Sequence, residues 1–196
     1  MKVCNISAQF SESLFVKNLS AQVDVIIHAY GILLALPLIL DDDERIEYLS
    51  LGAGTGGKKY DLSTSKRVAE FKFAKWSKNR NAIRQNNIFT DYLELTIDKE
   101  SPGKRKYIYC YSANAVKRFL STSKRSLESV LSKNSINKRH TKYQQDFITI
   151  KGFYDAHKDK DVRVEIVCLE KILIGCQHCE NANCYDIGEQ SCLAQS

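Results

Sequence analysis

The sequence predicts an α/β fold in which helices flank a mixed β-sheet. Short segments alternate β-branched or aromatic residues with polar ones, a pattern typical of half-buried strands. Longer segments with apolar residues at helical spacing lie between them. The 196-residue chain is 43% apolar and 27% charged, which provides for one sizeable core and excludes overall disorder. We therefore expect a single α/β domain with a short appendage.

The first part of the chain predicts one helix and three strands. Alternation is strongest in the third strand, where Val68, Phe71 and Phe73 are interspersed with polar residues. A tight turn at Ser63–Lys66 precedes that strand. The predicted elements are a helix at 11–36 and strands at 45–52, 58–63 and 67–74.

The second part of the chain adds a helix and a fourth strand, and then further elements. The order of helix, three strands, helix and strand predicts a mixed sheet covered on both faces. We expect one domain over residues 1–174 and a Cys-rich, irregular tail over 175–196. The predicted elements are a helix at 79–96, a strand at 105–112, helices at 113–132 and 139–156, and a strand at 162–169.

Residues 25–40 form an apolar run that His28, Gly31 and Pro37 interrupt. A membrane span needs about 20 apolar residues, so we predict a buried helix that packs on the sheet and no membrane partner. The N-terminus lacks a secretory signal, and the seven cysteines are odd in number. Both observations favour a reducing cytoplasm.

Three charged residues on two adjacent strands carry the most chemical information. Glu70 and Lys72 are two residues apart on one strand and therefore share a face. If the strands form a hairpin about Ser63–Lys66, Asp61 is the cross-strand neighbour of Glu70, at roughly 5–8 Å. Two close carboxylates repel each other, and a divalent cation relieves that repulsion. Mg²⁺ (or Mn²⁺) bound by Asp61 and Glu70, with Lys72 beside the attacking water, would suit phosphodiester hydrolysis.

Asp61 followed by Glu70-Phe71-Lys72 resembles the signature of the PD-(D/E)xK nucleases, which are restriction-endonuclease-like enzymes. The resemblance covers roughly residues 11–112, and the helix–strand–strand–strand–helix–strand order is similar to the core of that superfamily. It implies that Asp61 and Glu70 bind the metal and that Lys72 is the catalytic lysine. Tyr60 stands where the signature has Pro.

Some exonuclease-like branches of this superfamily carry a Gln on the following helix, and here Gln85 is the polar residue on an otherwise apolar stripe. The resemblance implies that Gln85 contacts the metal-bound water or the substrate phosphate; an amide bonded to backbone at the edge of the core is the alternative. A Glu on the first helix often assists the metal in this superfamily. Glu12 and, on the first strand, Glu47 are both open to that role.

The glycine-rich stretch Gly52–Gly57 is similar to nucleotide-binding loops. The P-loop pattern fails at Lys59, where Ser or Thr is required. The first motif of S-adenosylmethionine-dependent methyltransferases is a further alternative, but it requires a crossover helix, and the segment before the next strand is too short for one. A flexible hairpin connection is the simplest interpretation.

Positive charge surrounds the proposed site although the whole chain carries only +6. Between residues 58 and 84 there are nine basic residues and two acidic ones, and the acidic ones are Asp61 and Glu70. Such a surface attracts phosphates, with Trp76 and the Tyr107–Tyr111 run as candidates for base stacking. We expect nucleic acid as the partner, with DNA favoured over RNA. The candidate contacts are Lys58, Lys75, Arg80 and Arg84.

The C-terminal tail contains four cysteines that are candidates for a structural Zn²⁺ site, since a C-x-x-C pair can bind zinc. Their spacing matches no common zinc module, and reduced thiols are the alternative. The four are Cys176, Cys179, Cys184 and Cys192.

The sequence therefore predicts a metal-dependent nuclease. The alternative from another class is a non-catalytic nucleic-acid-binding subunit with the same fold, and a methyltransferase is a third. A chain of this size also allows a homodimer or a larger complex.

Overall fold

The computed structural model describes residues 3–52, 60–76, 82–131, 143, 145–160 and 163–174; within residues 3–21 it describes the side chains of Glu12 and Leu19 only. These residues form a mixed α/β fold around one five-stranded sheet. The first six elements follow the order helix, three strands, helix, strand, as the sequence predicted.

The strands follow one another across the sheet in chain order, and their pairing changes from antiparallel to parallel at the third strand. The first three strands pair antiparallel, whereas the last three pair parallel. An antiparallel neighbour needs only a turn, but a parallel neighbour needs a longer crossover, which explains why helices connect the strands only after the third strand. The strands are β1 (Ile46–Leu49), β2 (Leu62–Thr64), β3 (Arg67–Lys72), β4 (Arg105–Cys110) and β5 (Val164–Cys168).

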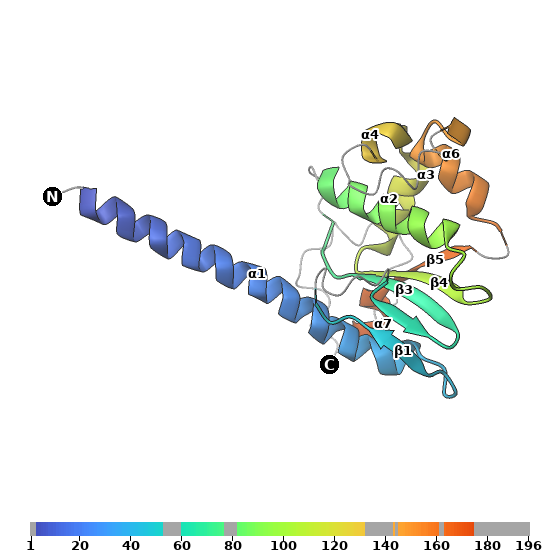
Figure 1. Ribbon diagram of the computed structural model, residues 1–196, viewed down its shortest axis with the longest axis horizontal. Coiled ribbons are helices and arrows are strands. Elements are labelled where there is room, and N and C mark those ends of the chain that lie inside the picture. Colours follow the sequence, from blue (N-terminus) through green and yellow to red (C-terminus); the bar gives the residue numbers. More distant parts are fainter. Residues whose placement is uncertain are drawn as a thin grey trace, which may run out of the picture.

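Helices cover both faces of the sheet (Figure 1). On one face lie α1 (Val3–Ile39) and α7 (Leu169–Ile174), and on the other lie α2 (Ala82–Ile97), α3 (Ala113–Thr122), α4 (Leu127–Leu131) and α6 (Ile150–His157). Side chains alternate between the two faces along β3. Val68 belongs to the core beneath α2, whereas Ala69 and Phe71 belong to the core beneath α1. The predicted mixed sheet with helices on both faces is confirmed.

The predicted single helix at 113–132 is wrong in detail, because the structure divides it into α3 and α4. Ser123, which ends α3, adopts an extended backbone. Ser126 then pairs with Thr149, and the Leu127 N–H donates to the Ile148 carbonyl at 3.1 Å. This short pairing with a distant segment competes with helical hydrogen bonds, and local sequence does not reveal it.

The predicted helix at 139–156 also differs from the structure, in which α6 begins only at Ile150. Thr149 is extended, and its side chain accepts a hydrogen bond from the Gly152 N–H at 3.1 Å, which makes it an N-cap. The helix α7 follows β5 directly and was not predicted. The tail from residue 175, with Cys176, Cys179, Cys184 and Cys192, lies outside the described residues.

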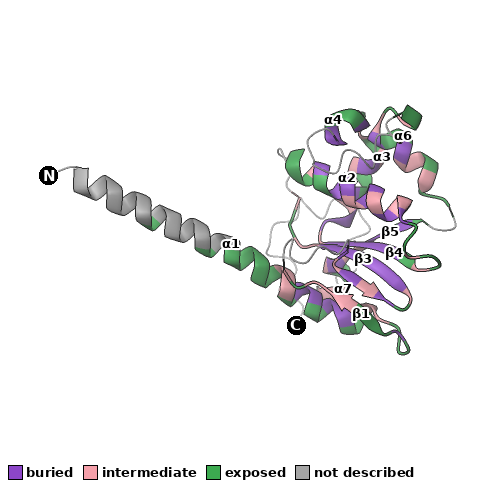
Figure 2. Cartoon of the chain, viewed as in Figure 1, coloured by how far each residue is buried: buried purple, intermediate pink, exposed green. Residues whose placement is uncertain are grey.

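Helix α1 packs on the sheet as predicted, but the prediction that this helix is buried is wrong for most of its apolar stretch. Ile32, Ala35 and Leu36 pack against the sheet, but only 28% of the stretch Gln22–Ile39 is buried. Residues 22–27 are all exposed, because α1 extends past the sheet (Figure 2). By length and composition this stretch could cross a membrane, a test that core helices of soluble proteins also pass. The cytoplasmic location stays a prediction.

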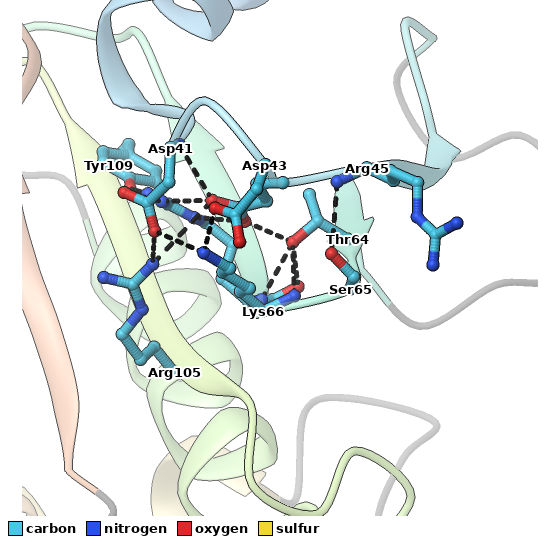
Figure 3. A network of polar contacts seen from close by, with 10 residues as sticks. Asp41, Asp43, Arg45, Thr64, Ser65, Lys66, Arg105 and Tyr109 are labelled. Atoms are coloured by element: carbon cyan, nitrogen blue, oxygen red, sulfur yellow. Dashed lines mark hydrogen bonds and ion pairs between the residues drawn. The ribbon is translucent and has the colours of Figure 1, made fainter.

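A buried ion pair joins the end of α1 to the sheet. Glu44 lies in the turn between α1 and β1, and the Arg67 Nε donates to its Oε1 at 2.6 Å. Arg67 also donates from Nη1 to the Tyr109 hydroxyl oxygen at 2.9 Å, and Thr64 donates to Glu44. Asp41 and Arg105 extend the network toward solvent (Figure 3). Three sequence-distant segments are thereby held at the start of β3.

Candidate active site

The hairpin of β2 and β3 brings Asp61 and Glu70 side by side. Leu62 pairs with Ala69 and Ser63 with Val68, so continuing this register by one residue places Asp61 opposite Glu70. The Phe71 N–H donates to the Asp61 Oδ2 at 2.9 Å. The turn about Ser65 and Lys66 sets this register, as the sequence indicated.

Lys72 lies between two carboxylates. Its Nζ is 2.9 Å from the Glu70 Oε2, on the same face of β3, and 3.0 Å from the Asp91 Oδ2. Asp91 lies on α2, so this ion pair connects the hairpin to the helix that follows it. Sequence reasoning missed Asp91, because its distance from the hairpin depends on how α2 packs across the sheet.

The cluster carries more negative charge than one ammonium can neutralise. Burial raises the pKa of Glu70 to about 8, and the nearby Asp91 and Asp61 carboxylates add to the rise. Burial also raises the pKa of Asp91. Burial alone would lower the pKa of Lys72, but the carboxylates of Asp91 and Glu70 outweigh it and raise the pKa. Lys72 therefore stays charged while the carboxylates around it compete for protons.

Asp61 is the member of the cluster that stays ionised most readily. Burial would raise its pKa, yet the contact with His28 and the hydrogen bond from the Phe71 N–H lower it below the ordinary value. The anionic form of Asp61 therefore has two partners that the other carboxylates lack. A carboxylate held ionised in a half-buried position is suited to binding a hard cation.

His28 on α1 is a neighbour of the cluster that sequence reasoning did not select. Its Nε2 lies 3.7 Å from the Asp61 Oδ2 and has no hydrogen-bond partner among the described residues. The ring packs edge-on against Phe73, with centroids 5.7 Å apart. The sequence feature that could have indicated His28 is its position as a polar residue within an apolar run, about one turn before Gly31.

Gly31 permits the close approach that puts His28 at this position. A Cβ on Gly31 would lie 2.3 Å from the Phe73 Cε1, which is far inside van der Waals contact. Only a residue without a side chain allows α1 to pass so close to the end of β3. The lack of a side chain at Gly31 therefore allows His28, three residues earlier on the same helix, to lie beside Asp61.

Asp61 and Glu70 provide the oxygen ligands that Mg²⁺ prefers, and the crowding of charge around them fits a cation. The Asp91 Oδ2 is buried without a hydrogen bond, although it is ion-paired with Lys72. Among the residues that the structure describes, no group of three His, Cys, Asp or Glu side chains is already arranged to hold a metal. Two carboxylates with water completing the shell are the usual arrangement for Mg²⁺.

Gln85 does not join this cluster. Its side-chain oxygen accepts a hydrogen bond from the Arg125 Nη1 at 3.1 Å, and the neighbouring Asn86 accepts from the Nη2 at 2.7 Å. Arg125 thus holds the start of α2 against the segment between α3 and α4. The Gln85 oxygen thus has a partner on another segment, and the contact of Gln85 with a metal-bound water stays a prediction.

The two other glutamates considered for metal assistance lie apart from the cluster. Glu12 is exposed on the part of α1 that extends away from the sheet. Glu47 on β1 pairs with the Lys104 Nζ at 2.6 Å and accepts a hydrogen bond from Ser63 at 3.3 Å. Among the described residues of α1, His28 is the one that reaches Asp61.

Two of the four basic residues expected to contact nucleic acid lie together beyond the end of β3. Lys75 and Arg84 are exposed, and the Arg84 Nη1 donates to the Lys75 carbonyl oxygen at 3.0 Å. The Lys75 Nζ lies 5.7 Å from the centre of the Tyr111 ring. Lys58 and Arg80 fall outside the described residues, as does most of the glycine-rich stretch at 52–57.

Three of the aromatic residues proposed for base stacking pack against other residues, namely Tyr107, Tyr109 and Trp76, whereas Tyr111 is half-buried beside Lys75. Tyr107 and Tyr109 are 8% and 2% exposed in the core beneath α1. Trp76 packs against Phe119, with ring centres 5.6 Å apart. Strand β4 is covered on both faces, so the alternation of its tyrosines does not mark an exposed face.

Comparison of the chain with family models, with curated proteins and with solved structures found no match in any of the three. Inferences about function therefore depend on the chain's own residues and on the motif that they resemble.

Proposed function

We propose that this chain is a metal-dependent nuclease that hydrolyses phosphodiester bonds of nucleic acid, with DNA favoured over RNA. The observation that carries the proposal is the convergence of Asp61, Glu70 and Lys72 at the end of one β-hairpin, in a half-buried cluster beside basic surface. The restriction-endonuclease-like fold belongs to the same proposal. Its support is the order of the first six elements and the change from antiparallel to parallel pairing at β3.

Each residue of the cluster has a distinct role in the proposal. Asp61 and Glu70 hold Mg²⁺ or Mn²⁺, which supplies a Lewis acid for the scissile phosphate and lowers the pKa of a bound water. Lys72 places its ammonium beside the attacking water and the developing negative charge on phosphorus. Asp91 is a positioning residue, because its carboxylate would remain paired with Lys72 if Glu70 held the cation. Lys75 and Arg84 attract the phosphate backbone.

Cleavage of labelled DNA by the purified chain tests the proposal. We expect cleavage that requires Mg²⁺ or Mn²⁺ and a loss of about 100-fold or more in Lys72→Ala, since one positioned charge stabilises a transition state by that order. Asp91→Asn should reduce the rate less, because it removes a residue that positions Lys72 but leaves the ammonium itself in place. Lys104→Ala is the matched control, since Lys104 pairs with Glu47 on the exposed side of the hairpin. Cleavage unaffected by Lys72→Ala would contradict the assignment.

The alternative is a non-catalytic nucleic-acid-binding subunit. The observation that favours it is the double pairing of Lys72, whose ammonium is held by both Glu70 and Asp91. A binding subunit would show salt-dependent affinity for DNA and no cleavage with either metal, and Asp61→Ala would leave that affinity unchanged. Gel-shift titrations at several salt concentrations, run beside the cleavage assay, distinguish the two functions.

A further inference from the structure

The outward face of α1 carries large apolar residues at the alternating spacing of a coiled-coil seam. Successive positions are separated by four, three, four and three residues, which is the heptad a/d pattern. Every one of these side chains is between 44% and 64% exposed. The seam consists of Leu19, Val23, Ile26, Tyr30 and Leu33.

The seam lies opposite the face of α1 that packs on the sheet. Ile32, Ala35 and Leu36 contact the sheet, and Ile32 and Ala35 occupy the heptad positions on the far side of the helix from Tyr30 and Leu33. The domain therefore buries one side of α1 and leaves the seam uncovered. In the part of the chain that the structure describes, no element packs against it.

The positions that flank the seam are apolar or uncharged. Ile27 and Leu34 lie beside it, and they are 51% and 44% exposed. In the sequence, the other flanking positions between 19 and 34 hold Ser20, Gln22 and Ala29, while Asp24 lies away from the seam. Two copies of this face could therefore meet without like charges in opposition.

The exposed area is large enough for a helix pair. With about 180 Å² for each large apolar residue, the seam and its two flanking residues expose roughly 600–700 Å². Two such faces would bury about 1,300 Å², within the range of specific interfaces. Because a two-fold pair brings the same patch of both subunits together, a self-complementary seam requires no second protein.

We propose that α1 pairs with α1 of a second copy of this chain through this seam. A lipid bilayer is a less suitable partner for the seam, because the helical turns from Gly31 onward are packed on the sheet. The stretch from Gln22 to Gly31 is only ten residues, roughly 15 Å of helix, and the hydrocarbon of a bilayer is about 30 Å thick. Asp24 also lies within that stretch. The inference does not depend on the proposed nuclease function.

Sedimentation velocity of the full chain in excess reductant tests the pairing. At tens of micromolar we expect twice the 22.3 kDa mass of one chain. Ile26→Lys should sediment as a monomer, because it places a charge in the seam at a residue that is 64% exposed. Val25→Lys is the matched control: the residue is adjacent and 39% exposed, but it points away from the seam, so this variant should remain a dimer.

Three outcomes would overturn the proposal. One is a monomeric wild-type chain at these concentrations, and another is equal dissociation of both variants. The third is flotation of wild-type protein with phosphatidylcholine and phosphatidylglycerol vesicles when it is monomeric without them, which would identify a membrane surface as the occupant. Far-UV circular dichroism of each variant separates loss of pairing from loss of folding.

Discussion

Glu44 and Arg67 form a charge pair that the surrounding structure isolates from water. Their side chains are 0% and 4% exposed. Each ion compensates the desolvation of the other, and Thr64 and Tyr109 satisfy their remaining hydrogen-bonding atoms. Removing one partner from such a pair is much more destabilising than removing an exposed pair.

We expect Glu44→Gln to destabilise the protein by about 3 kcal/mol at pH 7, because it leaves the buried guanidinium with only the half-exposed Asp41 carboxylate, 3.5 Å away, as a counter-ion. Asp43→Asn is the control. Asp43 pairs with Lys66 at the surface, where an ion pair contributes little to stability. Urea denaturation measures both differences, and equal effects of the two variants would contradict the buried-pair account.

The contribution of Glu44 should also depend on pH. Burial alone would raise its pKa, but the hydrogen bonds from Arg67 and Thr64 lower it from 4.5 to about 2. A carboxyl group whose pKa is lower in the folded state than in the unfolded state stabilises the protein at pH values above its unfolded pKa. The difference in stability between wild type and Glu44→Gln should therefore be constant near neutral pH and shrink as pH falls from about 4.5 toward 2.

Proximity of Asp61, Glu70 and Lys72 could be predicted from sequence because only local rules decide it. A turn at 63–66 and the two-residue period of a strand are sufficient. His28 and Asp91 could not be predicted, since each comes from a helix whose distance to the hairpin depends on packing. For Gln85, the sequence did not indicate the hydrogen bond from Arg125, 40 residues later, because it depends on how distant segments pack.

At the scale of elements, α1 approaches β3 more closely than an ordinary helix can. The contact between Gly31 and the Phe73 ring controls this approach. It also places His28 on α1 against both Phe73 and Asp61. A change at Gly31 should therefore affect stability and the candidate site together.

We expect Gly31→Ala to destabilise the protein by about 1–3 kcal/mol, because the new methyl group overlaps the Phe73 ring. DNA cleavage should fall as α1 moves His28 away from Asp61. The double variant Gly31→Ala/Phe73→Leu supplies the control, since a smaller side chain provides room for the methyl group. Thermal unfolding and cleavage rates measure both effects, and failure of the double variant to recover stability would argue against this contact as the cause.

Helices and strands could be predicted where local sequence determines the structure. They could not be predicted where contacts with a segment distant in sequence determine it. The hairpin of β2 and β3 was predicted from alternation and turn residues. The break between α3 and α4 was not, because it results from pairing with Thr149. For α1, the apolar run predicted a helix correctly but not its burial, since the size of the sheet determines how many turns are covered.

At the scale of the whole molecule, the candidate site reduces the stability of the fold. The raised pKa of Glu70, about 8, means that at neutral pH the folded chain holds a proton that the unfolded chain has lost. The stability of the protein should therefore decrease as pH rises from about 4.5 to about 8. Buried, repelling charges of this kind are typical of functional sites, where stability is sacrificed for activity.

We expect Glu70→Gln to raise the unfolding temperature in the absence of metal, because a neutral isostere removes a buried carboxylate from the cluster. Mg²⁺ should stabilise the wild type, since it binds the folded state alone, and should not stabilise this variant. Glu165→Gln is the control, because Glu165 is exposed on β5. Calorimetry with and without Mg²⁺ measures the shifts, and a lower unfolding temperature in metal-free Glu70→Gln would refute this account.

Helix α1 presents one face to the candidate site and the opposite face to solvent within the same two turns. His28 and Gly31 contact Asp61 and Phe73, while Ile26 and Tyr30 lie on the seam. A rigid helix cannot shift at one face without shifting at the other. If two copies pair through the seam and pairing shifts α1, association would be thermodynamically linked to occupation of the candidate site. By reciprocity, any factor by which association changes affinity for a ligand is the factor by which that ligand changes association.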